Sequence, residues 1–280
     1  MEIVSNKIYY ISSSDLKKLS KFELWNLEKA YNYVCYDIDF FKLYSKIYHM
    51  KSSQILNDNL VNELIGQIIT SYFNDNIIKS KLFVGEDKVH YLLTENFIKI
   101  GKKYTSVPDD IFYKFKYYVT RLDILVLDDL DVLYDSYRYK FDTYDLKRLK
   151  YDLKVMIVID YIMGQIDRDY RNFMFEYSKN HIKLCPLYDF EYSFMIGEKN
   201  IQYKCNSFDF DLDNEEIVKY IRSDEDFQKI ISIAMSLKFK NVLEQLYDEY
   251  GIIFNEDEKN KYNKVIAKKQ EDIKKYKLLR

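Results

Sequence analysis

Three polar side chains in the second half of the chain have the types and spacing of a site for metal-assisted phosphoryl transfer. Asp167 and Asn172 lie five positions apart in a polar segment, and Asp189 follows 22 residues after Asp167. In that chemistry one aspartate orients the attacking hydroxyl group and accepts its proton. An asparagine amide oxygen and a second aspartate hold Mg²⁺ against the phosphates. The spacing therefore predicts Asp167 as the catalytic residue, and Asn172 and Asp189 as metal ligands.

The elements around these residues can bring them together. An apolar pattern of helical period covers residues 143–163 and stops at Gly164, just before the polar segment. Two short extended stretches, 173–177 and 182–184, then separate Asn172 from Asp189. We expect a helix, a loop, a hairpin and a second loop, with the two loops facing each other.

Two motifs at this separation resemble the HipA-like branch of the protein-kinase-like fold. In that family the catalytic loop reads Asp-x-x-x-x-Asn after a helix, with an Asn or Gln two residues ahead, and the metal-binding Asp follows in Pro-x-Tyr-Asp with a Ser shortly after. The matching residues here are Asp167 and Asn172, then Pro186, Tyr188, Asp189 and Ser193. The resemblance implies an α+β, two-lobed fold and the transfer of the γ-phosphoryl group of ATP, with Mg²⁺, to a Ser or Thr hydroxyl of a protein.

The first half of the chain supplies further residues that the resemblance assigns. Lys51 ends a strand-like run, and Glu63 stands near the start of a helical pattern over 59–73. By similarity to the family, Lys51 binds the α and β phosphates and Glu63 orients Lys51. The segment that links the lobes contacts adenine in the family, which assigns Glu95 and Phe97 to cofactor binding.

The scarcity of glycine is a departure from the family. The chain has six Gly, and residues 1–50 contain none, so a Gly-rich loop over the phosphates is excluded there. The one cluster of small residues in this region is the serine triplet 12–14. Either these serines bind the phosphates, or the lobe is remodelled and nucleotide binding is weak. The second case favours a pseudokinase that binds a partner without transferring phosphate.

Pattern and composition change along the chain near Glu95. Residues 1–95 predict a small mixed α/β lobe on the phosphate side of the nucleotide, and residues 96–280 predict a mostly helical lobe that carries the catalytic and metal-binding loops. We expect strands within 39–50, a hairpin of 78–84 with 89–93, and helices at 15–33, from Pro108 onward, and at 215–221, 226–250 and 256–277.

Composition excludes several other classes of protein. With 43 basic and 45 acidic residues the formal charge is −2, which disfavours direct binding of nucleic acid or of an anionic membrane. Three scattered cysteines, Cys35, Cys185 and Cys205, form neither a disulfide framework nor a zinc motif. No apolar stretch approaches the roughly 20 residues of a transmembrane helix, and the N-terminus has no pattern of a secretory signal. We expect a cytoplasmic protein.

Several alternatives stay open at this stage. An Arg next to a catalytic loop either binds phosphate or pairs with an acid, and the sequence favours an ion pair for Arg168. Asp169 and Glu191 are expected to be exposed charges, although Glu191 remains a candidate metal ligand. A kinase of the CotH type, or one acting on a lipid or small molecule, has a related arrangement of residues. The family also implies a protein substrate and an antitoxin-like partner protein.

Overall fold

The structure, a computed structural model, is described for the better-placed parts of the chain. These are residues 1–3, 9–11, 17–18, 40–43, 46–85, 87–99, 102–105, 141–168, 172–194, 212–213 and 215–279. The expected helix from Pro108 lies outside them.

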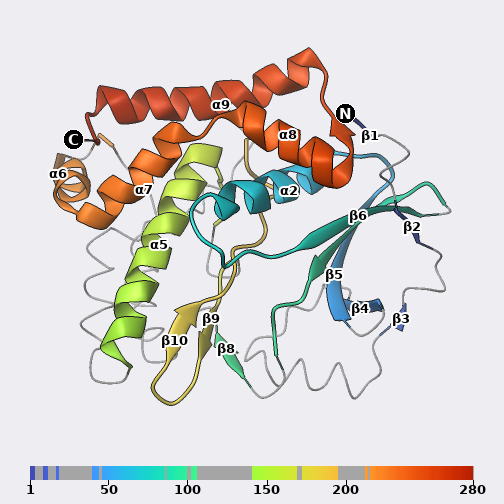
Figure 1. The fold of residues 1–280 in the computed structure, drawn as a ribbon, viewed down its shortest axis with the longest axis horizontal. Helices are drawn as coiled ribbons and strands as arrows, with labels where there is room; N and C mark the ends of the chain where they lie inside the picture. Colours follow the sequence, from blue (N-terminus) through green and yellow to red (C-terminus); the bar gives the residue numbers. More distant parts are fainter. Residues whose placement is uncertain are drawn as a thin grey trace.

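A sheet with the strand order β2-β6-β7-β5-β4-β3 dominates the first hundred residues (Figure 1). β2 pairs with β6 in parallel, and the other neighbours are antiparallel. The expected strands within 39–50 and the expected hairpin are confirmed. The expected helix over 15–33 is wrong at its start, because residues 17–18 pair with β4, and its remainder lies outside the described residues. The strands are β2 (Tyr9–Ile11), β3 (Lys17–Lys18), β4 (Phe40–Leu43), β5 (Lys46–Ser53), β6 (Ser80–Gly85) and β7 (His90–Glu95).

Helix α2 (Asp58–Ser71) lies between this sheet and the helices α5 and α8 (Figure 1). It begins where the Asn57 side chain accepts a hydrogen bond from the Leu60 backbone N–H, which satisfies one of the free donors of the first turn. Eleven consecutive residues from Leu60 are buried, polar ones included. Because α2 is covered on several sides, its polar side chains must find partners within the protein.

Helix α5 (Thr143–Met163) begins and ends where the sequence pattern predicts. The Asp142 carboxylate accepts hydrogen bonds from the first turn, and Gly164 ends the helix in the left-handed conformation with φ 60°, which glycine adopts at little cost. The helix packs on α7, α9 and β10 and forms the centre of the large hydrophobic core. Its C-terminal end carries the chain directly into the segment of Asp167.

The rest of the described chain consists of a small sheet and four helices. β8 (Lys103–Thr105), β9 (Phe175–Tyr177) and β10 (Ile182–Leu184) form an antiparallel sheet. The predicted helix 226–250 is two helices, because the buried Leu237 adopts an extended conformation and turns the chain. These elements are α6 (Glu215–Ser223), α7 (Glu225–Ser236), α8 (Phe239–Tyr250) and α9 (Glu256–Lys275), with the short strand β11 (Ile252–Ile253) paired to β1 (Glu2–Ile3). Within the described ranges no helix is long and apolar enough to cross a membrane.

Candidate active site

Asp167 and Asn172 lie together in the loop after α5. The Asn172 amide nitrogen donates to the backbone carbonyl of Asp167 and lies 3.4 Å from a carboxylate oxygen of Asp167. Asn172 is buried, with 8% of its surface exposed. The hydrogen bonds therefore fix the direction in which the Asn172 amide oxygen and the Asp167 carboxylate point.

Arg168 joins this loop to the loop of Asp189. Its side chain is 1% exposed, and its guanidinium pairs with the Asp160 carboxylate of α5 at 3.0 Å. The same group donates to the backbone carbonyls of Asn172 (2.6 Å) and Tyr188 (2.5 Å). Burial alone would lower the pKa of Arg168, but the charge and hydrogen bond of Asp160, together with the charges of Asp189 and Glu63, raise that pKa. The ion pair expected from the sequence is present, and it is structural.

The loop of Asp189 is held from two directions. Asp189 has a φ of 61°, in the left-handed region that few non-glycine residues adopt. Its backbone N–H and that of Phe190 donate to the Glu63 carboxylate of α2 at 3.1 and 2.7 Å, and its carbonyl accepts from the Gln165 amide at 2.7 Å. These bonds hold the residue in a strained conformation that the free chain would seldom adopt.

The Lys51 ammonium group lies among three carboxylates. It is 2.7 Å from Asp189, 3.3 Å from Glu191 and 3.7 Å from Glu63. Burial opposes its charge, but the nearby acids more than offset this and raise the pKa of Lys51. Glu63 thus lies near Lys51, as the sequence predicts, yet its shortest hydrogen bonds go to the loop backbone. Lys51 makes its closest contact with Asp189.

Glu191 is a member of this group and not the exposed charge that the sequence favours. Its side chain is 24% exposed and reaches Lys51. Burial raises the pKa of Glu191, Lys51 opposes the shift, and the charges of Asp189 and Glu63 add to it. Three carboxylates therefore surround a single ammonium group in this part of the site.

The electrostatics of Tyr192 connect the catalytic loop with the group around Lys51. The pKa of its phenol is raised by the charge of Glu191, then by burial and by the charges of Asp167 and Asp189, while Lys51 lowers it. The contacts of Arg168 place the two loops side by side, because its guanidinium donates to the carbonyls of Asn172 and Tyr188.

The two residues assigned to adenine occupy different surroundings. The Glu95 carboxylate forms an ion pair with Lys46 at 2.8 Å, at the end of β7. Phe97 packs against the rings of Tyr188 and Tyr104, with ring centroids 5.7 and 6.4 Å apart. Phe97 thus contacts the residue that precedes Asp189, whereas the Glu95 side chain pairs away from the Lys51 group.

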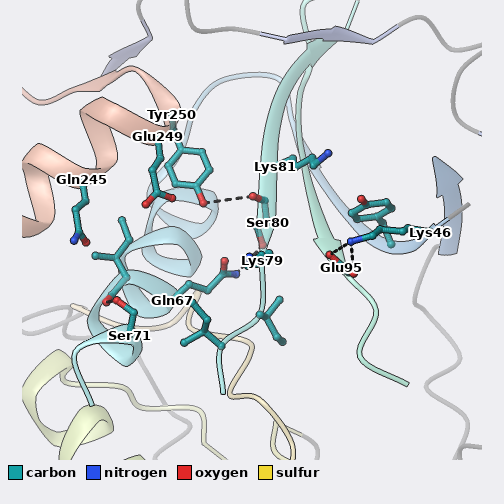
Figure 2. Close-up of a pocket in the computed structure, with 14 residues that line it drawn as sticks. Lys46, Gln67, Ser71, Lys79, Ser80, Lys81, Glu95, Gln245, Glu249 and Tyr250 are labelled. Carbon is teal, nitrogen blue, oxygen red and sulfur yellow. Dashed lines mark hydrogen bonds and ion pairs between the residues drawn. The ribbon is translucent and has the colours of Figure 1, made fainter. Parts of the chain in front are cut away.

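A pocket of about 670 Å³ lies on another side of α2, between α2, β6 and α8 (Figure 2). Gln67 links it to the group at Lys51, because its amide nitrogen donates to the Ser80 hydroxyl at 2.8 Å and lies 3.5 Å from Glu63. Glu95, one of the two residues predicted to bind adenine, lines this pocket, but none of the candidate catalytic or metal-binding residues does. The candidate active site is therefore the region of Lys51, Asp167 and Asp189.

Comparison with known proteins identifies the fold. No family model and no curated protein matches the sequence. Among solved structures, the Helicobacter pylori proinflammatory kinase CtkA is similar with a TM-score of 0.61 and 13% identity, over 95% of this chain and 96% of that chain. HipA, from a toxin–antitoxin complex of Shewanella oneidensis MR-1 with HipB and operator DNA, is similar with a TM-score of 0.53 and 13% identity, over 97% and 74%. The chain has the HipA-like kinase fold. This confirms the α+β, two-lobed architecture expected from the two motifs.

Within the HipA-like kinase fold of this chain, two residues of α2 contact the Asp189 loop without being predicted. Asn62 donates from its amide nitrogen to the carbonyls of Glu191 and Ser193. Gly66 approaches Phe190 so closely that a Cβ atom at this position would lie 2.2 Å from the ring. The available signal is an asparagine and a glycine inside a helical pattern, where neither residue has high helix propensity.

We expect Gly66→Ala to destabilise the protein by about 1–3 kcal/mol, the usual cost of excess volume in a packed core. In an unconstrained helix the same change would stabilise by up to about 1 kcal/mol, so the sign of the effect reports the contact with Phe190. Chemical denaturation of the single variant and of Gly66→Ala combined with Phe190→Leu measures this. The double variant should recover part of the loss; an effect of Gly66→Ala that is unchanged in the Phe190→Leu background would contradict the explanation.

Proposed function

We propose that this protein is an ATP-dependent kinase that transfers the γ-phosphoryl group to a Ser or Thr hydroxyl of a protein. The observation that carries the proposal is the joining of three segments: Lys51 pairs with Asp189 at 2.7 Å, and Arg168, next to Asp167, donates to the carbonyls of Asn172 and of Tyr188, which precedes Asp189. A kinase needs a cation for the phosphates, an acceptor for the hydroxyl proton and a metal-binding acid within one site.

Each side chain has a defined role in this reaction. Asp167 orients the acceptor hydroxyl and accepts its proton, and Lys51 neutralises phosphate charge. The oxygens of Asn172 and Asp189 would hold Mg²⁺, since carboxylate and amide oxygens are its preferred protein ligands. When bound, the metal supplies positive charge at the β and γ phosphates. Glu63 acts through the backbone of the Asp189 loop as well as through Lys51.

The nucleotide and partner assignments follow the same proposal. Residues 1–95 form the lobe that holds the phosphates, and residues 96–280 carry the catalytic and metal-binding loops. Adenine binds beside Glu95 and Phe97, through backbone groups of the linking segment. Because the similar HipA structure contains HipB, we include an antitoxin-like protein partner in the proposal, with a cytoplasmic location and a protein substrate.

Mg²⁺-ATP is expected to stabilise the purified protein by about 2.7 kcal/mol at a concentration of 100 times its dissociation constant. This corresponds to a rise of roughly 5–10 °C in the melting temperature for a chain of this size. Thermal-shift titration measures binding, and transfer of labelled γ-phosphate to the protein or to a lysate measures activity. Failure of both would overturn the proposed function.

A pseudokinase is the second candidate. It is favoured by the contacts of Lys51, whose ammonium is already bound by Asp189 and Glu191, and by the absence of glycine from residues 1–50. Nucleotide binding without transfer to any substrate is the result expected for this alternative.

A further inference from the structure

Helix α2 binds the main chain of the Asp189 loop at four points. Glu63 accepts the two N–H groups of residues 189 and 190, at 3.1 and 2.7 Å. One residue earlier in the helix, the Asn62 amide nitrogen donates to the carbonyls of Glu191 (3.0 Å) and Ser193 (2.9 Å). The two neighbouring side chains therefore hold the loop at its start and at its end.

We propose that Asn62 is a positioning residue that sets the metal-binding geometry of the Asp189 loop. The inference deepens the proposed kinase function and rests on it for its metal-dependent part. The left-handed backbone of Asp189, with a φ of 61°, is unfavourable for a residue with a side chain, so it persists only where neighbouring bonds hold it. Glu63 holds the N–H side of this turn, and Asn62 holds the carbonyl side.

Few side chains can replace Asn62 at this point. The residue is 1% exposed, and both acceptors are backbone carbonyls, so the side chain must present two N–H donors from one short stem. A primary amide does this. Leucine has nearly the same shape but leaves both carbonyls without their donor, and aspartate places a carboxylate against two carbonyl oxygens.

The effect on the metal follows from where the two carbonyls lie. Glu191 is both the residue whose carbonyl Asn62 holds and a member of the acidic group around Lys51. Its position relative to Asp189 is fixed by the turn between them. Loosening this turn displaces the carboxylate of Asp189, a proposed Mg²⁺ ligand, so the affinity for a divalent cation should fall while contacts of ATP elsewhere remain.

Asn62→Leu tests the inference by two measurements. Hydrogen exchange of the amides at 189 and 190 is expected to accelerate by roughly 5- to 30-fold, the equivalent of one to two lost hydrogen bonds. The Mg²⁺ concentration needed for half-maximal nucleotide binding should rise by a similar factor, with binding of ATP without metal unchanged. The matched control is Asn76→Leu, because the Asn76 amide also donates to a backbone carbonyl, that of Leu184 at 3.0 Å, which lies in β10 and outside residues 189–193.

The inference would be overturned if the amides at 189 and 190 exchanged in Asn62→Leu at the same rates as in the wild type. An unaltered Mg²⁺ dependence of nucleotide binding would also overturn it. If the wild type binds neither Mg²⁺ nor ATP, the kinase proposal fails, while the exchange measurement still tests whether Asn62 holds the loop. Should Asn62→Leu fail to fold, Asn62→Asp replaces it. Protonation of this buried acid at low pH restores one donor, so exchange protection, corrected for the intrinsic rate, should improve from pH 8 to pH 5; no such improvement would contradict the inference.

Discussion

Replacing Asp189 by asparagine is expected to lower the rate of phosphoryl transfer by on the order of 10²–10³, the usual cost of losing one group that stabilises developing charge. The change keeps the size of the side chain and removes its negative charge. Because the reaction depends on positioning and electrostatics, a neutral amide in place of the metal-binding carboxylate should reduce kcat more than the affinity for ATP.

Asparagine is the appropriate replacement because of the backbone at this position. Asp189 has a φ of 61°, and asparagine is among the few residues that adopt this conformation readily. The backbone N–H at this position donates to Glu63, and its backbone carbonyl accepts from Gln165. Both hydrogen bonds involve the main chain of residue 189, so they remain in the variant. Loss of one acid from the group around Lys51 should leave the melting temperature unchanged or slightly raised.

Asp145→Asn is the matched control, because it makes the same replacement outside the site. Asp145 lies on α5 and pairs with the exposed His181 at 2.8 Å. Steady-state phosphoryl transfer, with circular dichroism to verify folding, measures both variants. A folded Asp189→Asn protein with the activity of the wild type would show that Asp189 is not a metal ligand in the reaction.

Long regular patterns of apolar residues predict the helices and strands that carry the site, because such patterns indicate directly which residues are buried. The ends of α5 follow from Asp142 and Gly164, which supply a cap and a stop. The break between α7 and α8 is not predictable in this way. No glycine or proline stands near Leu237; the chain turns there because Leu237 and Phe239 are both buried in the core, which is a property of the assembled helices.

Spacing predicts which segments meet at the site but not which atoms bind. Asp167 and Asn172 are found together as expected. Glu63 binds backbone N–H groups, and main-chain partners leave no trace in a residue pattern. The position of Glu191 depends on the left-handed turn at Asp189, which redirects the chain, so that the two acids reach the same lysine.

Replacing Arg168 by methionine is expected to destabilise the protein by about 3–5 kcal/mol, the cost of leaving a buried charge unpaired. Asp160 would lose its ion pair at 3.0 Å, and the carbonyls of Asn172 and Tyr188 would lose their donor. Methionine keeps much of the volume beside the Phe190 ring, which lies 4.9 Å from the guanidinium. The melting temperature should fall by roughly 10 °C.

The pH dependence of this variant separates charge burial from lost packing. Burial already raises the pKa of Asp160, with Arg168 opposing the shift; without Arg168 the raised pKa should rise further. A carboxyl whose pKa is higher in the folded state destabilises the fold where it is ionised. The variant should therefore regain stability, relative to the wild type, as the pH falls from 8 to 5.

Combining Arg168→Met with Asp160→Leu distinguishes the structural role of Arg168 from its role in the site. Removing both charges should restore most of the stability, because an apolar pair can replace a buried ion pair at little cost. Activity should stay low, since nothing then joins the carbonyl of Asn172 to that of Tyr188, next to Asp189. Stability and phosphoryl transfer are measured on the same preparation of the double variant. If activity recovered along with stability, Arg168 would contribute only to folding.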